Sequence, residues 1–208
     1  MRNQEEYNFL KDFATEDVAY FRKIVIECVL ATDLAKTMTW LSSARVAFTS
    51  NVGGVMSSSA LSPSDYGITS SSALSPAELK KKEMEMKILK MQLVVKCADV
   101  GHPSRPLALH LEWSSRIRDE FFAQGDKERS KGMTISPLCD RSVPASTFPQ
   151  GQLGFINFVS RPVFSLLSAV CSNEHEDESK PWLDNLESNV KYWEEEAAKC
   201  KPQVTSPS

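Results

Sequence analysis

The chain has 208 residues, with 24 Lys and Arg against 27 Asp and Glu, and a formal net charge of -3. It is long enough for one domain with a core, and it lacks the basic surplus typical of nucleic-acid-binding domains. No run approaches the roughly 18 apolar residues of a membrane span, and no apolar segment near the N-terminus suggests a signal peptide. We therefore expect no transmembrane segment and no nucleic-acid partner.

Residues 5–48 are predicted to be helical. From Thr15 the sequence Thr-Glu-Asp offers a cap with acids in the first turn. Apolar residues then recur at helical spacing: Val18, Phe21, Val25, Cys28 and Val29.

Residues 49–76 differ in composition, because they are rich in Ser and Gly and repeat Ser-Ser-Ser-Ala-Leu-Ser-Pro at 57–63 and 70–76. A repeat this short cannot bury a face of its own, so we predict a flexible insertion. Phosphorylation of the Ser-Pro pairs is the alternative role for this segment.

The remaining segments also show helical patterns. A helix over 77–100 begins at Ser75-Pro76, carries a stripe through Met84, Ile88, Met91 and Val95, and ends at Gly101-His102-Pro103. Further helices are predicted over 105–131, 150–171 and 181–200, with an ordered loop over 133–149. Pro162 should kink its helix near Phe158.

The fold class that follows is all-α, since no segment favours a strand. Four parts are predicted: a helical part over 1–48, the insertion over 49–76, the remainder of the domain over 77–200, and a disordered tail over 201–208. An acidic turn at 174–180 precedes the last helix.

Asp99 is the first residue that could carry chemistry. It follows an apolar run and stands at the end of a predicted helix, where a carboxylate opposes the helix macrodipole. A bound metal cation would compensate that charge, and pairing with a Lys or Arg is the alternative.

Gln152 and Phe155 are three residues apart and therefore share a helix face. An amide suits the edge of a purine, and a phenyl ring can stack on the base. The same spacing fits an ordinary helix with a surface and a core side. His102 and His110 are separated by a proline break and do not have a standard ligand spacing.

The cysteines, five in number, are far apart and form no C-x-x-C pair, which argues against disulfides and a zinc ribbon. We therefore expect free thiols and an intracellular, cytoplasmic location. The sequence also lacks G-x-S-x-G, a Gly-rich phosphate loop and H-E-x-x-H.

Several segments, taken in order, resemble class I 3′,5′-cyclic-nucleotide phosphodiesterases. The segments are the helix over 21–36, Lys-Cys-Ala-Asp-Val-Gly-His-Pro over 96–103, Glu-Phe-Phe-Ala-Gln-Gly-Asp-Lys-Glu-Arg over 120–129, Ile-Ser-Pro-Leu-Cys-Asp-Arg over 135–141, and Gly-Gln-Leu-Gly-Phe-Ile-Asn-Phe over 151–158. The helix between Trp182 and Trp193 resembles the family's closing helix. The resemblance omits only residues 49–76 and the tail.

The resemblance implies a role for each candidate residue. Asp99 would be a ligand in a centre of two divalent metals, Zn and Mg or Mn, which activates a bridging water. Gln152 would hold the purine of a cyclic nucleotide, clamped between Phe155 and Ile117. Four residues fall where the family lines its base pocket: His102, His110, Phe121 and Leu138. The implied reaction is hydrolysis of cAMP, cGMP or both to the 5′-monophosphate, in signal transduction.

The sequence departs from the family in its metal ligands. Neither the His-Asn-x-x-His motif, which supplies the general-acid His, nor the His-Asp pair is present. The implied fold is thus a compact multi-helix phosphodiesterase-like domain whose N-terminal helices are missing, with no catalytic residue of its own. One carboxylate cannot supply the ligands that Zn²⁺ or Mg²⁺ needs, so we expect the isolated chain to be inactive.

Two alternatives stay open. The chain could be a non-catalytic truncated helical module that binds nucleotide weakly or pairs with an intact phosphodiesterase. It could also be a fragment whose exposed apolar faces prevent stable folding. The sequence does not separate cAMP from cGMP, because the Gln152 amide can rotate to suit either purine.

Overall fold

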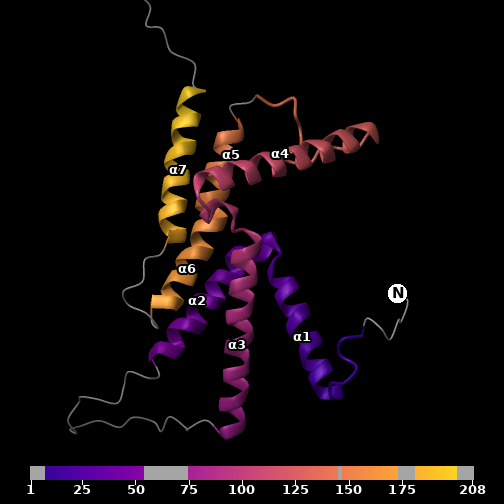
Figure 1. The fold of residues 1–208 in the computed structure, drawn as a ribbon, viewed down its shortest axis with the longest axis vertical. Helices are drawn as coiled ribbons and strands as arrows, with labels where there is room; N and C mark the ends of the chain where they lie inside the picture. The colour runs from indigo at the N-terminus through magenta and orange to yellow at the C-terminus, as the bar shows by residue number, and fades with distance from the viewer. Residues whose placement is uncertain (1–7, 54–74, 145–146, 173–180, 201–208) are drawn as a thin grey trace, which may run out of the picture. The chain divides into compact units, whose positions relative to one another are not determined.

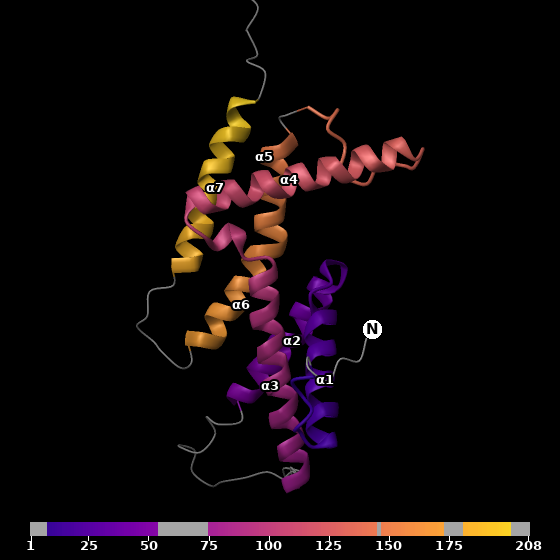
Figure 2. The ribbon, with the colours of Figure 1, turned by 45° about the vertical axis from the view of Figure 1, so that its right-hand side comes forward.

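A computed structural model describes residues 8–53, 75–144, 147–172 and 181–200. Within these ranges the regular structure is helical and no strand occurs, which confirms the all-α class. The chain divides into two compact units, unit 1 over Met1–Lys96 and unit 2 over Cys97–Ser208. Figure 1 and Figure 2 show the elements of each.

Unit 1 contains α1 (Thr15–Ala31), a 3₁₀ turn η2 (Leu34–Lys36), α2 (Thr37–Gly53) and most of α3 (Pro76–Asp99). The prediction of one helix over 5–48 is wrong in its continuity. The Asp33 carboxylate accepts a 3.0 Å hydrogen bond from the Ala35 amide, which caps the 3₁₀ turn and interrupts the helix.

The start of α1 also differs from the prediction. Ala14 occupies the N-cap position and makes no side-chain cap bond, so Thr15 is the first helical residue and not the cap. Glu16 and Asp17 lie in the first turn, as predicted, where they complement the helix dipole.

The start of α3 is confirmed in detail. The amide and hydroxyl of Ser75 each donate to a Glu78 carboxylate oxygen at 2.7 Å, and the Glu78 amide donates back to Ser75 Oγ at 3.3 Å. This reciprocal pair is a capping box, and Pro76 occupies the first helical position.

Polar side chains join α3 to α1 and α2. Gln92 accepts from Trp40 Nε1 at 2.9 Å and donates to the Glu27 carbonyl at 3.4 Å. The ammonium group of the fully buried Lys96 donates to the Ala31 carbonyl at 2.7 Å, at the end of α1. These hydrogen bonds join α3 to the C-terminal part of α1 and to α2.

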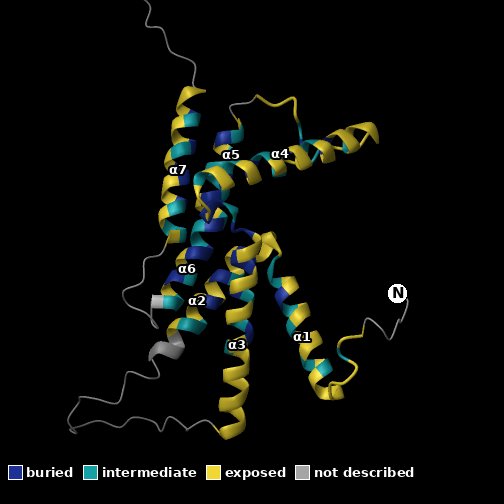
Figure 3. Cartoon of the chain, in the orientation of Figure 1, coloured by how far each residue is buried: buried dark blue, intermediate teal, exposed yellow. Residues whose placement is uncertain are grey.

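Much of the predicted apolar stripe of unit 1 is exposed, as Figure 3 shows. On α1 only Cys28 is buried, while Val25 is 42 % and Val29 61 % exposed. On α3 the buried apolar positions include Ile88 and Leu93, whereas Met84, Met91 and Val95 of the predicted stripe are exposed. Periodicity identified apolar faces, and the described residues of unit 1 do not cover them.

Unit 2 contains a 3₁₀ turn η3 (His102–Ser104), α4 (Leu107–Ser130), α5 (Thr147–Phe155), a π-helical segment η4 (Ile156–Ser160), α6 (Arg161–Ser172) and α7 (Pro181–Lys199). In Figure 1 and Figure 2 the run from α5 to α6 lies beside α7. The core between them is formed by Ile156, Val163, Leu166, Leu186, Val190 and Trp193.

A π-helical segment occupies the position near Phe158 where a kink is predicted, and the kink itself stays a prediction. Pro162 has no amide hydrogen to donate to the carbonyl four residues earlier, which is that of Phe158. The backbone widens to π geometry over Ile156–Ser160 and returns to α geometry at Arg161. The helix begins at Thr147, three residues earlier than predicted.

The run Thr147–Cys171 meets the length and composition of a membrane span, with a mean hydropathy of 1.5. This corrects the expectation that no segment does. Core helices of folded domains have the same length and composition, and this run makes the contacts of a core helix. Arg161 pairs with Glu187 of α7, and Ile156 and Val163 are completely buried.

The predicted division at residues 48, 76 and 200 stays a prediction. Helix α2 extends to Gly53 and α3 begins at Pro76, while most of the predicted insertion lies outside the described residues. The acidic turn over 174–180 and the tail over 201–208 also lie outside them.

Candidate functional site

The site begins where α3 ends at Asp99. A Cβ on Gly101 would lie 2.5 Å from the Cys97 carbonyl oxygen, so only glycine allows the chain to turn this closely. The turn continues into η3, where Ser104 Oγ donates to the Gly101 carbonyl at 2.7 Å. This turn sets the position of His102.

Helix α7 holds η3 through two asparagines. The amide of the buried Asn189 donates to the carbonyls of Pro103 at 2.7 Å and Arg105 at 2.9 Å, and Asn185 donates to the Ser104 carbonyl at 3.0 Å. Carbonyls of a turn that no helix or sheet could satisfy thereby gain partners. Nothing in the spacing of α7 distinguishes these asparagines, so the sequence analysis missed them.

Three rings form a near-parallel stack across unit 2. The His102 ring lies 5.0 Å from His110 with an interplanar angle of 17°, and 5.7 Å from Phe155 with an angle of 15°. His110 also meets the edge of Trp193 at 5.8 Å. The structure thus brings together three of the predicted site residues, from η3, α4 and α5.

Hydrogen bonds connect this stack to Gln152. The Trp193 indole donates to His110 Nε2 at 2.6 Å, and His110 Nδ1 lies 3.1 Å from His102 Nδ1. Ser114, one turn after His110 on α4, donates to Gln152 Oε1 at 3.1 Å. Trp193 and Ser114 were not predicted as site residues, because their contacts join positions 83 and 38 residues apart in sequence.

Burial sets the charge of the two histidines. Desolvation lowers the pKa of His102 to about 4, and it lowers the pKa of His110 to about 4 together with the nearby His102. Both rings are therefore neutral at pH 7, and the site offers polarity without a positive charge.

Asp99 is exposed, and its carboxylate makes no hydrogen bond or ion pair with any described residue. Two residues that follow Asp99, Val100 and His102, contact the α5–η4 run. The Ser160 hydroxyl donates to the Val100 carbonyl at 3.1 Å, and His102 stacks on Phe155.

The described residues do not fit a two-metal centre. They include no group of three or more His, Cys, Asp or Glu side chains that could hold a metal ion. A single carboxylate leaves most positions around Zn²⁺ or Mg²⁺ without a protein ligand. The role of Asp99 as a ligand therefore stays a prediction.

The other predicted residues lie around the stack with less contact. Ile117 is half-buried on the same face of α4 as His110 and Ser114, and Phe121 lies one turn further, 37 % exposed. Leu138 is 67 % exposed and has a positive φ of 68°, and its side chain lies against Gly151. The pairing of Ile117 with Phe155 as a clamp stays a prediction.

The loop that carries Leu138 is fixed to α4 by ionic contacts. Arg141 Nε donates to Asp126 at 3.0 Å, Arg129 donates to Asp140 at 2.7 Å, and the Ser136 amide donates to Glu128 at 2.7 Å. The Arg141 hydrogen bond lowers the pKa of Asp126. These contacts confirm the predicted ordered loop over its described part.

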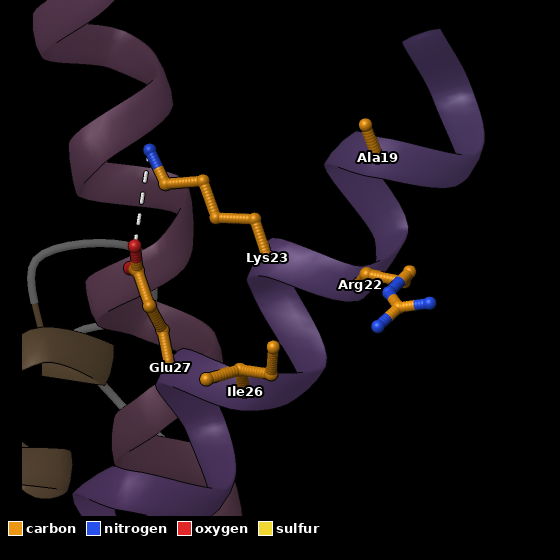
Figure 4. Close-up of a pocket in the computed structure, with 5 residues that line it drawn as sticks. All are labelled: Ala19, Arg22, Lys23, Ile26 and Glu27. Atoms are coloured by element: carbon orange, nitrogen blue, oxygen red, sulfur yellow. Dashed lines mark ion pairs between the residues drawn. The ribbon is translucent and has the colours of Figure 1, made fainter. Parts of the chain in front are cut away.

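A surface hollow on α1 is separate from these residues in sequence. Figure 4 shows its lining of Ala19, Arg22, Lys23, Ile26 and Glu27, with Lys23 and Glu27 paired at 3.8 Å. All five belong to one helix, and the pair is an i,i+4 contact. The hollow contains none of the predicted site residues.

In unit 2, an all-helical framework thus places an amide, a phenyl ring and two neutral imidazoles together. The family model described as 3′5′-cyclic nucleotide phosphodiesterase matches residues 1–183. Because the match covers most of the sequence, the chain belongs to the 3′,5′-cyclic nucleotide phosphodiesterase family.

Curated relatives include the 3′,5′-cyclic-AMP phosphodiesterases 4C of Mus musculus and Rattus norvegicus. The mouse protein is 30 % identical over 201 residues, which are 97 % of this chain and 25 % of that protein. The rat protein is 30 % identical over 198 residues, which are 95 % of this chain and 32 % of that protein. The chain therefore spans about a quarter to a third of these relatives.

Solved structures show the same fold. LmjPDEB1 in complex with IBMX matches with a TM-score of 0.64 and 26 % identity, over 90 % of this chain and 46 % of that one. The phosphodiesterase domain of the RhoPDE fusion protein from the choanoflagellate Salpingoeca rosetta matches with a TM-score of 0.69 and 20 % identity, over 95 % of this chain and 53 % of that one. The chain thus corresponds to about half of each solved domain.

Proposed function

We propose that this chain is part of an enzyme that hydrolyses 3′,5′-cyclic nucleotides to 5′-monophosphates, and that unit 2 supplies its base-binding surface. Membership of the family supports the reaction. The stack of His102 on Phe155 and the hydrogen bond from Ser114 to Gln152 support the base-binding role. The names of the two curated relatives favour cAMP as the first substrate to test.

The chemistry of the proposed surface suits a purine. The Phe155 ring offers a face for stacking, and the Gln152 amide, held by Ser114, offers hydrogen bonds to the base edge. The neutral imidazoles allow close approach of an uncharged base without the desolvation of a cation. Each contributes binding and orientation, and none performs the bond cleavage.

We further propose that the 208 residues by themselves do not hydrolyse cyclic nucleotides. The support is the lack of a suitable ligand group among the described residues and of His-Asn-x-x-His anywhere in the sequence. An intracellular, cytoplasmic location also stays a proposal, supported by the five free cysteines.

Hydrolysis and binding assays on the purified chain test both statements. We expect no turnover of cAMP or cGMP with Mg²⁺, Mn²⁺ and Zn²⁺ present. Calorimetry should show weak binding of cAMP that falls at least several-fold in Gln152→Ala and Phe155→Ala. Turnover that Asp99→Ala abolishes would contradict inactivity of the chain, although it would support the family reaction.

Matched controls lie on the same helical run. Gln150 is exposed two residues before Gln152, and Phe158 is 75 % exposed. Gln150→Ala and Phe158→Ala should leave the affinity for cAMP unchanged. Equal losses in the control variants would contradict the base-binding surface.

A second candidate function is association with an intact phosphodiesterase. The apolar residues Val25, Ile26, Val29 and Leu30 of α1 are 42 to 63 % exposed, which is typical of a surface that another protein covers. Co-purification with an intact family member should be lost in Val29→Asp with Leu30→Asp. Retention in that variant would exclude α1 as the contact.

A further inference from the structure

Trp193 contacts His110 of the ring stack through its ring and also through its indole nitrogen. Its indole nitrogen lies 2.6 Å from His110 Nε2, and an indole N–H can only donate. His110 Nε2 must therefore be the unprotonated, accepting nitrogen. Since a neutral imidazole carries one proton, the proton of His110 is on Nδ1.

The protonation of His110 also determines the tautomer of His102. The two Nδ1 atoms lie 3.1 Å apart, a hydrogen-bond distance that requires one protonated and one bare nitrogen. Because His110 Nδ1 carries the proton, it donates the hydrogen bond and His102 Nδ1 accepts that bond. The proton of His102 is therefore on Nε2.

Ser114 gives an independent indication of the same direction. Its hydroxyl has one proton, which it donates to Gln152 Oε1 at 3.1 Å. Towards His110 Nδ1, at 3.5 Å, the Ser114 oxygen can therefore only accept. A protonated His110 Nδ1 suits the Ser114 oxygen as an acceptor, whereas a bare Nδ1 would face the lone pairs of that oxygen.

The end of this chain of hydrogen bonds is open. His102 is half-buried beside Phe155, and its Nε2 has no hydrogen-bond partner among the described residues. The desolvation that keeps both rings neutral prevents a second proton from removing the distinction between their nitrogens.

We propose that Trp193 is a positioning residue that fixes the tautomers of His110 and His102, so that His102 presents an N–H donor beside Phe155. The preferred ligand group is then a hydrogen-bond acceptor on a planar ring, such as a ring nitrogen or carbonyl oxygen. Only the identity of that ligand as a nucleotide base rests on the proposed function. The tautomers themselves are a property of the free chain.

Long-range ¹H–¹⁵N NMR correlation of the ¹⁵N-labelled 208-residue chain at pH 7 tests the proposal directly. Protonated and bare ring nitrogens have distinct ¹⁵N shifts, and His175→Gln and His102→Gln assign the three histidines. We expect His110 protonated on Nδ1 and His102 on Nε2. The opposite assignment for either ring would overturn the proposal.

Substitution of Trp193 separates its hydrogen bond from its bulk. Trp193→Phe retains an aromatic ring and removes the donor, so His110 should gain the Nε2-protonated tautomer and His102 should change with it. Trp113→Phe is the matched control, because Trp113 is 51 % exposed on α4 and forms no hydrogen bond or ring contact with either histidine. The control should retain both tautomers.

Each outcome is decisive without catalytic activity. Unchanged tautomers in a folded Trp193→Phe chain, or equal changes in the Trp113→Phe control, would contradict the role of Trp193. If Trp193→Phe does not fold, the assignment in the unsubstituted chain still decides the direction of the hydrogen bonds. Absence of turnover or of nucleotide binding would count against the proposed function and leave this assignment intact.

Discussion

Units 1 and 2 differ in how their apolar residues are used. Unit 2 buries Leu186 and Ile156 to 1 % exposure or less between α7 and the α5–η4–α6 run, and the buried Asn189 amide nitrogen and the His110 ring form hydrogen bonds to other elements. Unit 1 leaves Leu30 at 63 % and Val29 at 61 % exposure on α1. Unit 2 is therefore expected to carry most of the packing free energy and the candidate site.

The lesson of this comparison is that helical periodicity predicts an apolar face without predicting its cover. The sequence shows an apolar stripe on both α1 and α7. Only α7 meets described neighbours that bury it, and burial decides which residues stabilise the fold.

A matched pair of leucines gives the largest expected contrast. Leu186→Ala should lower the free energy of unfolding by about 2–5 kcal/mol, because it leaves a cavity in the core of unit 2. Leu30→Ala, the same change at an exposed site of unit 1, should stay within about 0.5 kcal/mol. Urea unfolding followed by circular dichroism measures both, and equal effects would refute the difference between the units.

Two buried or half-buried amides give a smaller contrast. Asn189→Ala should cost about 1–3 kcal/mol, because the carbonyls of Pro103 and Arg105 lose their donor. Gln92→Ala in unit 1 should cost less, since Gln92 is half-buried and its bond to the Glu27 carbonyl is long, at 3.4 Å. A greater loss in Gln92→Ala than in Asn189→Ala would reverse the order of the two units.

The histidines of unit 2 predict a dependence of stability on pH. Their pKa values, about 4 in the folded chain, lie below the ordinary value of 6.5. Below pH 6.5 the unfolded chain therefore binds protons that the folded chain does not, and stability falls as pH decreases towards 4. Between pH 7 and pH 5 we expect a loss of about 1–2 kcal/mol after allowing for solvent screening.

Variants identify the source of that dependence. His110→Gln should reduce the slope of unfolding free energy against pH between 7 and 5, whatever its effect on stability at pH 7. The carboxylates whose pKa values are lowered, such as Asp126, lose their stabilisation mainly below this window. An unchanged slope in His110→Gln would show that burial does not keep this ring neutral.

The smallest effect is expected at the exposed ion pairs of the Leu138 loop. Arg141→Met should change the unfolding midpoint little, because Arg141 and Asp126 are about half exposed and water screens their attraction. A loss as large as that in Asn189→Ala would show that the loop contributes to the core of unit 2.

The sequence predicted the helical class, the start of α3 at Ser75-Pro76 and the position near Phe158 where Pro162 disturbs the regular α-helix, because each depends on neighbouring residues. Family resemblance named His102, His110 and Phe155, which the structure brings together, and their role in binding stays a prediction. The sequence could not predict the bond from Trp193 to His110 or the support of η3 by Asn189, since these depend on helices distant in sequence. The burial of the apolar stripes in unit 1 was wrongly predicted for the same reason, because burial depends on neighbouring elements and not on spacing alone.

Nucleotide titration monitored by NMR tests the central claim most directly. With cAMP added to a chain selectively labelled at Phe and His, the resonances of Phe155 and His102 should shift together, while those of the exposed Phe158 and of Phe21 in unit 1 stay unchanged. Shifts confined to unit 1, or unchanged Phe155 and His102 resonances at saturating cAMP, would contradict a base-binding surface in unit 2.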